Sequence, residues 1–145
     1  MRYRKGYKYQ LEDDEVFYTS IFPLVDIVTQ FIDLTTTGKL TVKSGYAWDG
    51  PSGPTFDRKS NMRGSVAHDA LYQLIRQKLL DNMCREKADD YCCQCWIEDG
   101  MWPWLAKTEE ITLHKFAGPA ADPKNAKKIY EAPAPKYLLK RKLDI

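Results

Sequence analysis

The sequence predicts an α+β domain in which an N-terminal antiparallel sheet of three or four strands packs on two long helices and a third helix. Two observations lead to this prediction. Residues 25–43 have the β-branched composition and the central glycine of a hairpin, whereas residues 60–78 and 84–100 repeat apolar side chains at helical spacing. The length of 145 residues suits one domain, and no apolar run approaches the ~20 residues needed to span a bilayer.

The first part of the chain is predicted to consist of strands and turns. Residues 2–9 alternate tyrosine with basic residues, and residues 16–21 have β-type composition after an acidic turn. Residues 25–36 are predicted to form one strand, Gly38 to turn the chain, and residues 40–43 to return as the partner strand. A purely helical domain would instead be helical over this hairpin.

Helical periodicity, at about 100° per residue, predicts which side chains of the two long helices face the core. In the first helix His68 and Tyr72 lie one turn apart on the edge of the apolar arc, and Asp69 lies off it. In the second helix Asp89 falls inside the apolar arc. The break around Asp81 is short, so the helices are antiparallel neighbours and Asp89 lies level with His68 and Tyr72. A buried carboxylate needs a partner, so we expect Asp89 to contact His68.

Residues 46–54 (Tyr-Ala-Trp-Asp-Gly-Pro-Ser-Gly-Pro) precede the first helix and are predicted to form a fixed loop. Their glycines, prolines and aspartate restrict the backbone and leave N–H and C=O groups free to bind a ligand. A rigid turn and a satisfied buried pair would explain the loop and the His68–Asp89 contact without any function. The combination of all three features favours a functional site.

The second helix is expected to end at Gly100, and a third is expected over residues 102–116, with a proline in its first turn. We expect Trp96, Trp102 and Trp104 to lie together and to seal the base of the helical layer. The alternative is that these indoles form an exposed binding platform.

The predicted domain comprises residues 1–118, with residues 38–100 as its motif-bearing core. Residues 119–145 are rich in proline and lysine and are predicted to form a basic arm that packs on a partner. The net charge of +2 indicates no particular ligand, and alternating tyrosine and lysine is typical of an edge strand, so nucleic-acid binding is disfavoured. The basic N-terminus is not followed by an apolar stretch, so we expect no signal peptide and synthesis in the cytoplasm.

The cysteines are expected to be reduced and mostly buried. Three of the four lie on one predicted helix, at spacings that rarely allow disulfide geometry. A Cys-x-x-Cys pair could bind zinc, but only Cys84 and the distant His114 are available to complete the ligand set, so zinc is disfavoured. The residues concerned are Cys84, Cys92, Cys93 and Cys95.

Three motifs together resemble a family of bacteriophage and prophage proteins of unknown function. They are residues 45–54, residues 67–72 (Ala-His-Asp-Ala-Leu-Tyr) and residues 84–89 (Cys-Arg-Glu-Lys-Ala-Asp). The resemblance covers about residues 38–100 and implies a phage origin without stating an activity. Trp48, where that family more often has threonine, would narrow a pocket entrance, and Ser52 is a second candidate binding residue.

The same segment also resembles, more loosely, the helix pair of secreted and viral phospholipases. In those enzymes a histidine activates water, an aspartate on the antiparallel helix orients the histidine, and loop carbonyls with a further aspartate bind calcium. The resemblance implies that His68 is the base, Asp89 its orienting partner and Tyr72 a support. It implies a calcium ion on Asp69 and on loop residues, for which the candidates are Tyr46, Asp49 and Gly50. The paired cysteines that brace those enzymes are absent from this sequence.

Two functions follow as expectations. The first is a phage hydrolase that cleaves an ester or amide of the host envelope, either in lysis or when the phage enters the cell. The second is a non-catalytic component of the virion, in its tail or capsid, that uses the chain termini as assembly arms. The partners would be host envelope or phage structural proteins, and the protein would be found in the host cytoplasm or the virion.

Overall fold

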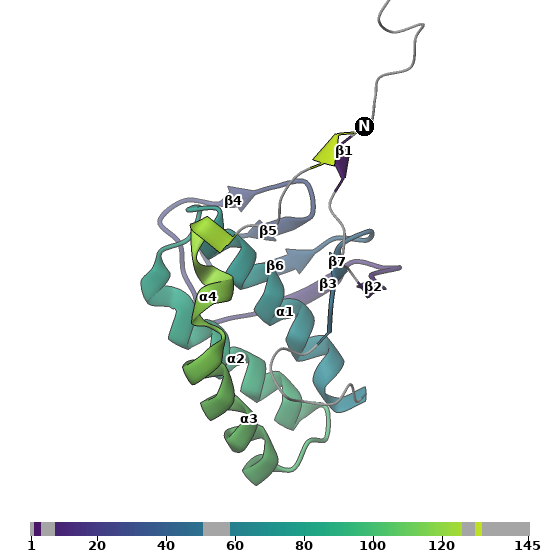
Figure 1. Ribbon diagram of the computed structural model, residues 1–145, viewed down its shortest axis with the longest axis vertical. Coiled ribbons are helices and arrows are strands. Elements are labelled where there is room, and N and C mark those ends of the chain that lie inside the picture. The colour runs from purple at the N-terminus through teal and green to yellow at the C-terminus, as the bar shows by residue number, and fades with distance from the viewer. Residues whose placement is uncertain (1, 4–7, 51–58, 126–129, 132–145) are drawn as a thin grey trace, which may run out of the picture.

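The computed structural model describes residues 2–3, 8–50, 59–125 and 130–131, and its fold is α+β, as predicted (Figure 1). Its main sheet has four antiparallel strands in the order β3-β6-β5-β4. Their bounds are β3 Glu15–Tyr18, β6 Lys39–Val42, β5 Ile32–Leu34 and β4 Ile27–Val28.

The predicted hairpin within residues 29–44 is confirmed as the pairing of β5 with β6. Leu34 lies opposite Leu40 in the register of these strands. Gly38 takes a φ of 88° in the connecting turn, and a Cβ there would lie 2.5 Å from the carbonyl oxygen of Thr19. Only glycine fits this turn without displacing the neighbouring backbone.

The prediction of one strand over residues 25–36 is wrong, because the segment forms two strands, β4 and β5. The Thr29 hydroxyl donates to the carbonyl of Ile32 at 2.7 Å and accepts from the Ile32 N–H at 2.9 Å. The Thr29 N–H also lies 3.2 Å from a carboxylate oxygen of Asp33. These side-chain bonds compete with the ladder and close a tight turn that composition alone does not reveal.

Two short antiparallel pairs accompany the main sheet. β2 (Tyr9–Gln10) pairs with β7 (Ala47–Trp48), and β1 (Arg2–Tyr3) pairs with β8 (Tyr130–Glu131). The second pair lies apart from the main sheet, next to the N-terminus (Figure 1).

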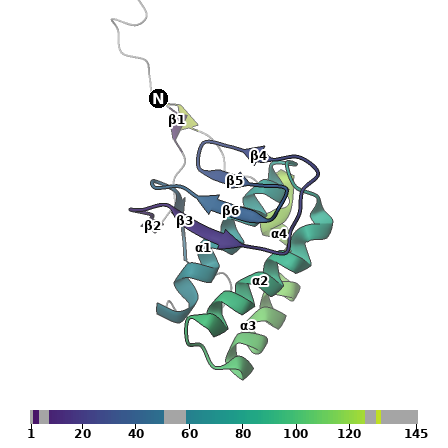
Figure 2. The ribbon, with the colours of Figure 1, turned by 180° about the vertical axis from the view of Figure 1, so that it is seen from behind.

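The helical layer follows the sheet in the chain. Its long members are α1 (Lys59–Arg76), α2 (Arg85–Glu98) and α3 (Pro103–Phe116), and α2 packs against both of the others. The short elements are η1 (Asn82–Cys84), α4 (Gly118–Ala121) and η2 (Pro123–Asn125). Figures 1 and 2 show the main sheet lying across one face of α1, with α3 at the end of the molecule away from the sheet.

The core forms where the sheet meets α1 and α2. Alternate sheet residues such as Phe17 and Leu40 are almost fully buried, and so are Ala67 and Leu71 of α1. The two helices approach closely at Gly64, where a Cβ would lie 2.8 Å from Trp96 and 2.9 Å from the carbonyl oxygen of Cys92. This close approach brings the inward faces of the two helices into register.

The three tryptophans do not seal the helical base together. Trp96 is buried and donates from Nε1 to the carbonyl of Asn61 at 3.1 Å. Trp102 and Trp104 instead retain 67% and 64% of their exposure and pack edge to face on each other. The prediction of a joint seal is wrong for these two residues, because they lie at the start of α3, where its first turn projects into solvent.

The segment after α3 does not leave the domain at once. α4 packs on α1 and its Ala121 is only 1% exposed, so residues 118–121 contribute to the helical layer. Of the rest of the predicted arm, residues 122–125, which include η2, and the two residues of β8 lie in the described part of the chain. In that described part, no helix has the length and apolar character needed to cross a membrane.

Candidate functional site

The predicted contact between the two antiparallel helices is confirmed. Nε2 of His68 on α1 lies 2.6 Å from Oδ1 of Asp89 on α2. The His68 side chain is 3% exposed and that of Asp89 is 0% exposed, so the pair is removed from bulk water. A carboxylate can only accept, so Nε2 is the protonated ring nitrogen and Nδ1 carries the lone pair of the neutral imidazole.

Tyr72, one turn along α1, supports the same carboxylate. Its hydroxyl donates to Asp89 Oδ1 at 2.5 Å, and its ring lies over the imidazole with centroids 4.0 Å apart. The Tyr72 oxygen in turn accepts from Nε of Arg85 at 3.2 Å. Arg85 also donates to the backbone carbonyl of His114 at 2.6 Å, so one guanidinium fixes α1, α2 and α3 around the site.

A second histidine lies on the other side of Asp89. Nδ1 of His114, on α3, lies 2.9 Å from Oδ2 of Asp89. This approach does not have hydrogen-bond geometry, and Oδ2 has no hydrogen bond to any other described residue. Asp89 therefore stands between two imidazoles, of which His68 is buried and His114 is 36% exposed.

Asp69 lies next to the free nitrogen of His68. Its Oδ1 is 3.8 Å from His68 Nδ1, which is too long for a direct hydrogen bond, and its side chain is 26% exposed. This places a partly exposed carboxylate on the side of the imidazole that is open to accept a proton.

The surroundings shift the pKa values of His68 and Asp89 in opposite directions. Burial favours the neutral imidazole, but the carboxylates of Asp69 and Asp89 outweigh it and raise the pKa of His68. Burial also opposes ionisation of Asp89, but hydrogen bonds from His68 and Tyr72 hold its pKa below the ordinary value. Burial, together with the nearby Asp49 carboxylate, raises the pKa of Asp69. Asp89 is thus the permanent anion of the site.

The residues of the predicted loop occupy different environments. The Tyr46 carbonyl already accepts from the Leu11 N–H at 2.8 Å, and Gly50 is buried with a φ of 87°. The exposed Asp49 accepts from the Lys8 N–H at 3.0 Å and lies close enough to raise the pKa of Asp69. The Asp49 and Asp69 carboxylates are thus near neighbours, whereas the Tyr46 carbonyl is largely committed to the backbone.

Trp48 is a packing residue and does not face an open entrance. It is 6% exposed, its Nε1 donates to Ser65 on α1 at 3.1 Å, and its ring packs on that of Tyr9. It anchors the beginning of the loop to the helix that carries His68. Ser52, the other candidate binding residue, lies outside the described residues.

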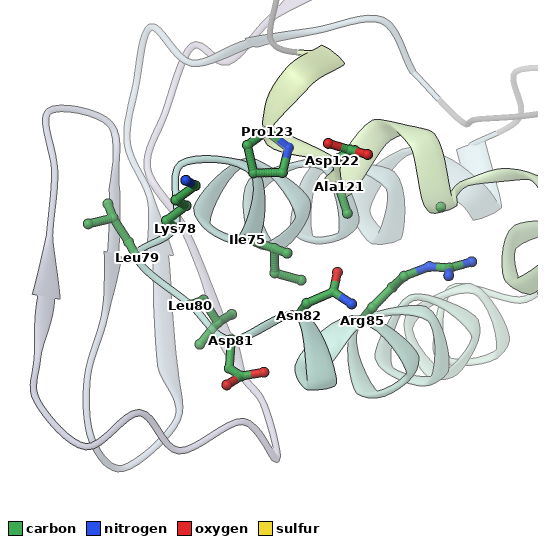
Figure 3. A pocket seen from close by; sticks show the side chains of 11 residues that line it. Ile75, Lys78, Leu79, Leu80, Asp81, Asn82, Arg85, Ala121, Asp122 and Pro123 are labelled. Carbon is green, nitrogen blue, oxygen red and sulfur yellow. The ribbon is translucent and has the colours of Figure 1, made fainter.

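A groove of about 780 Å³ opens at the end of the helix pair (Figure 3). It lies between the C-terminal end of α1, the start of α2 and the α4–η2 segment, and its lining includes Lys78, Asp81, Arg85 and Asp122. None of the predicted site residues that the structure describes lines it. Arg85 is shared by the groove and the site, because the same guanidinium bonds Tyr72.

The structure reveals a group of potential metal ligands that the sequence did not indicate. Single ligand atoms of Asp90, Glu110 and His114 all lie within 4.8 Å of one another, so this cluster could bind a metal ion. The sequence does indicate in part that His114 lies near α2. The short connection at Gly100 makes α3 antiparallel to α2, and this places His114 roughly level with Asp89.

The cysteines are free thiols, and those on α2 are buried while Cys84 is partly exposed. Burial raises the pKa of Cys93 and of Cys95 to about 11, so both are protonated at neutral pH. These side chains pack as small apolar residues.

Comparison with known proteins assigns no family, since no family model, curated protein or solved structure matches the chain.

Proposed function

We propose that the protein is a hydrolase in which His68 is the general base and Asp89 its orienting partner. The observation that supports this most directly is the orientation of the imidazole. Nε2 is bound to Asp89 at 2.6 Å, whereas Nδ1 faces the partly exposed Asp69 at 3.8 Å. Asp69 thus places a partly exposed carboxylate beside the ring nitrogen that would accept the proton.

The chemistry follows from this orientation. Nδ1 of His68 takes a proton from a water molecule while the water oxygen forms a bond to the carbonyl carbon of an ester or amide. The imidazolium is stabilised by Asp89 and then gives its proton to the leaving alcohol or amine as the bond to the carbonyl carbon breaks. A positioned base of this kind accelerates such reactions by roughly 10²–10⁴-fold.

Asp69 and Asp49 are the residues that would hold calcium next to the base. A bound calcium ion supplies positive charge to the oxyanion that forms on the carbonyl oxygen. The substrate class, an ester or amide of a bacterial envelope, rests on the resemblance of residues 38–100 to phage proteins. Action during lysis or when a phage enters its host follows from that class.

Two conservative variants test the proposal. The full chain is incubated with calcium and vesicles of phosphatidylethanolamine and phosphatidylglycerol, or with bacterial cell-wall peptides, and released products are measured. We expect Asp69→Asn and His68→Gln to lose at least ~10²-fold in rate, and Asp13→Asn, a change at an exposed turn, to have no effect. A folded Asp69→Asn protein with wild-type hydrolysis would contradict the proposal, as would the absence of any product from the wild type.

A second function, a non-catalytic virion component, is favoured by a separate observation. Large apolar side chains are exposed around β3 and β4, including Leu24 at 99%, Val25 at 71% and Val28 at 74%. Exposed apolar groups gathered in one segment are typical of a protein–protein contact. Sedimentation of the wild type and of Leu24→Lys tests this function, because an assembly built on this segment is lost in the variant.

A further inference from the structure

A side-chain cluster on the outer side of Asp89 has no part in the proposed hydrolysis. Nε2 of His114 lies 3.7 Å from Oδ1 of Asp90 on α2 and 3.9 Å from Oε1 of Glu110 on α3. His114 and Glu110 are one turn apart on α3, and this turn faces the middle of α2. Two helices therefore present one nitrogen and two oxygen atoms to the same point.

Asp89 orients the His114 ring through the ring nitrogen that faces away from Asp90 and Glu110. Nδ1 faces the buried Asp89 carboxylate at 2.9 Å, so the other ring nitrogen is turned toward Asp90 and Glu110. Arg85 fixes the backbone at the same residue through the His114 carbonyl. A histidine that contacts a carboxylate through one nitrogen and offers the other to an acidic cluster has the arrangement found in protein metal sites.

The two acidic side chains are held together although both can carry negative charge. Glu110 is largely buried, with 7% of its side chain exposed, and Asp90 is 65% exposed. Both approach Nε2 of His114, so oxygen atoms of the two carboxylates converge on one ring nitrogen. Lys107 pairs with the carboxylate oxygen of Glu110 that is turned away from His114, since its Nζ lies 2.9 Å from Oε2. The other oxygen, Oε1, is directed at His114.

We propose that His114, Glu110 and Asp90 bind a divalent transition-metal ion, for which zinc is the best match. The 3.7 and 3.9 Å separations between donor atoms are close to the ~3.4 Å edge of a tetrahedron with ~2.1 Å bonds to zinc. One imidazole with two carboxylates suits zinc or manganese, whereas calcium prefers oxygen alone. The exposed Asp90 gives the ion a path from solvent.

This metal site is separate from the proposed catalytic base. It lies on the Oδ2 side of Asp89, whereas His68 and Tyr72 bind Oδ1. The metal would hold His114 through Nε2 and leave Nδ1 facing Asp89 Oδ2, the buried oxygen that has no hydrogen bond to any described residue.

The test is metal binding to the chelator-treated full chain, with zinc measured by calorimetry and cobalt by visible absorption. We expect one zinc per chain and a cobalt spectrum without thiolate bands. Asp90→Asn, at an exposed position, and His114→Gln are each expected to weaken zinc binding more than about 100-fold, beyond the ~10–100-fold typical of residues behind the ligands. Circular dichroism checks that both variants are folded.

Two controls separate this site from others. Glu86→Gln changes an exposed carboxylate one turn before Asp90 on the same helix and is expected to leave binding unchanged. Cys84→Ser is also expected to bind zinc normally. Zinc binding that persists in Asp90→Asn and His114→Gln, that is lost in Cys84→Ser, or that is absent from the wild type would overturn the proposal. Because the readout is binding, its failure is independent of the outcome of the hydrolysis test.

Discussion

Replacing His68 with alanine is expected to destabilise the protein strongly, because it leaves a buried carboxylate without the imidazole that binds it. Asp89 is 0% exposed, so water cannot replace the imidazole at Oδ1 without opening the helix pair. Breaking a buried ion pair in this way costs about 3–5 kcal/mol. Tyr72 and His114 still contact Asp89, so we expect a loss near the lower limit, about 3 kcal/mol.

The measurement is reversible urea unfolding together with thermal unfolding. At this chain length a loss of that size lowers Tm by roughly 12 °C, at about 4 °C per kcal/mol. His68→Gln keeps a donor that can reach Oδ1 and is expected to lose only about 1 kcal/mol. Lys87→Ala, at an exposed position of α2, is the control and is expected to stay within about 0.5 kcal/mol. A His68→Ala protein within about 1 kcal/mol of wild type would refute this reasoning about the buried charge.

Three further outcomes are expected. The pKa of His68 is raised in the folded protein. Its contribution to the free energy of unfolding is therefore fully present at pH values below the ordinary histidine pKa and is lost as the pH rises through the pKa of the folded state. The lowered pKa of Asp89 makes its contribution complete above the ordinary aspartate value and lost as pH falls through the folded value. The pair is therefore expected to be most stabilising between about pH 4 and 6.5, and urea unfolding across pH that shows no loss above this window contradicts the shift. Gly64→Ala is expected to lower the free energy of unfolding by about 1–3 kcal/mol, because its Cβ would lie 2.8 Å from Trp96. An unchanged free energy of unfolding would show that α1 and α2 can move apart to accept the methyl group without cost. A thiol reagent is expected to modify Cys84 first and the three cysteines of α2 only after denaturation, whereas rapid reaction of all four in the native state contradicts their burial.

The helix pair and its central contact could be predicted because they depend on local information. A period of 3.6 residues places His68, Tyr72 and Asp89 on inward faces, and a short connection makes the helices antiparallel. The hairpin turn at Gly38 was equally local. The split of the segment over residues 25–36 was missed because it depends on bonds from the Thr29 side chain, which β-type composition conceals.

The rest of the site was decided by how the helices pack. His114 looked distant in the sequence and was considered only as a ligand for a cysteine zinc site, yet the crossing of α2 and α3 brings it to Asp89 and turns its other nitrogen toward Asp90 and Glu110. Trp48, which stands where the resembling phage family more often has threonine, was expected to narrow a pocket entrance, but the pairing of β2 with β7 buries it against α1. Sequence periodicity thus determined which helix faces point inward. Only the tertiary structure could decide which third element contacts the buried charge, because that depends on contacts between segments far apart in the chain.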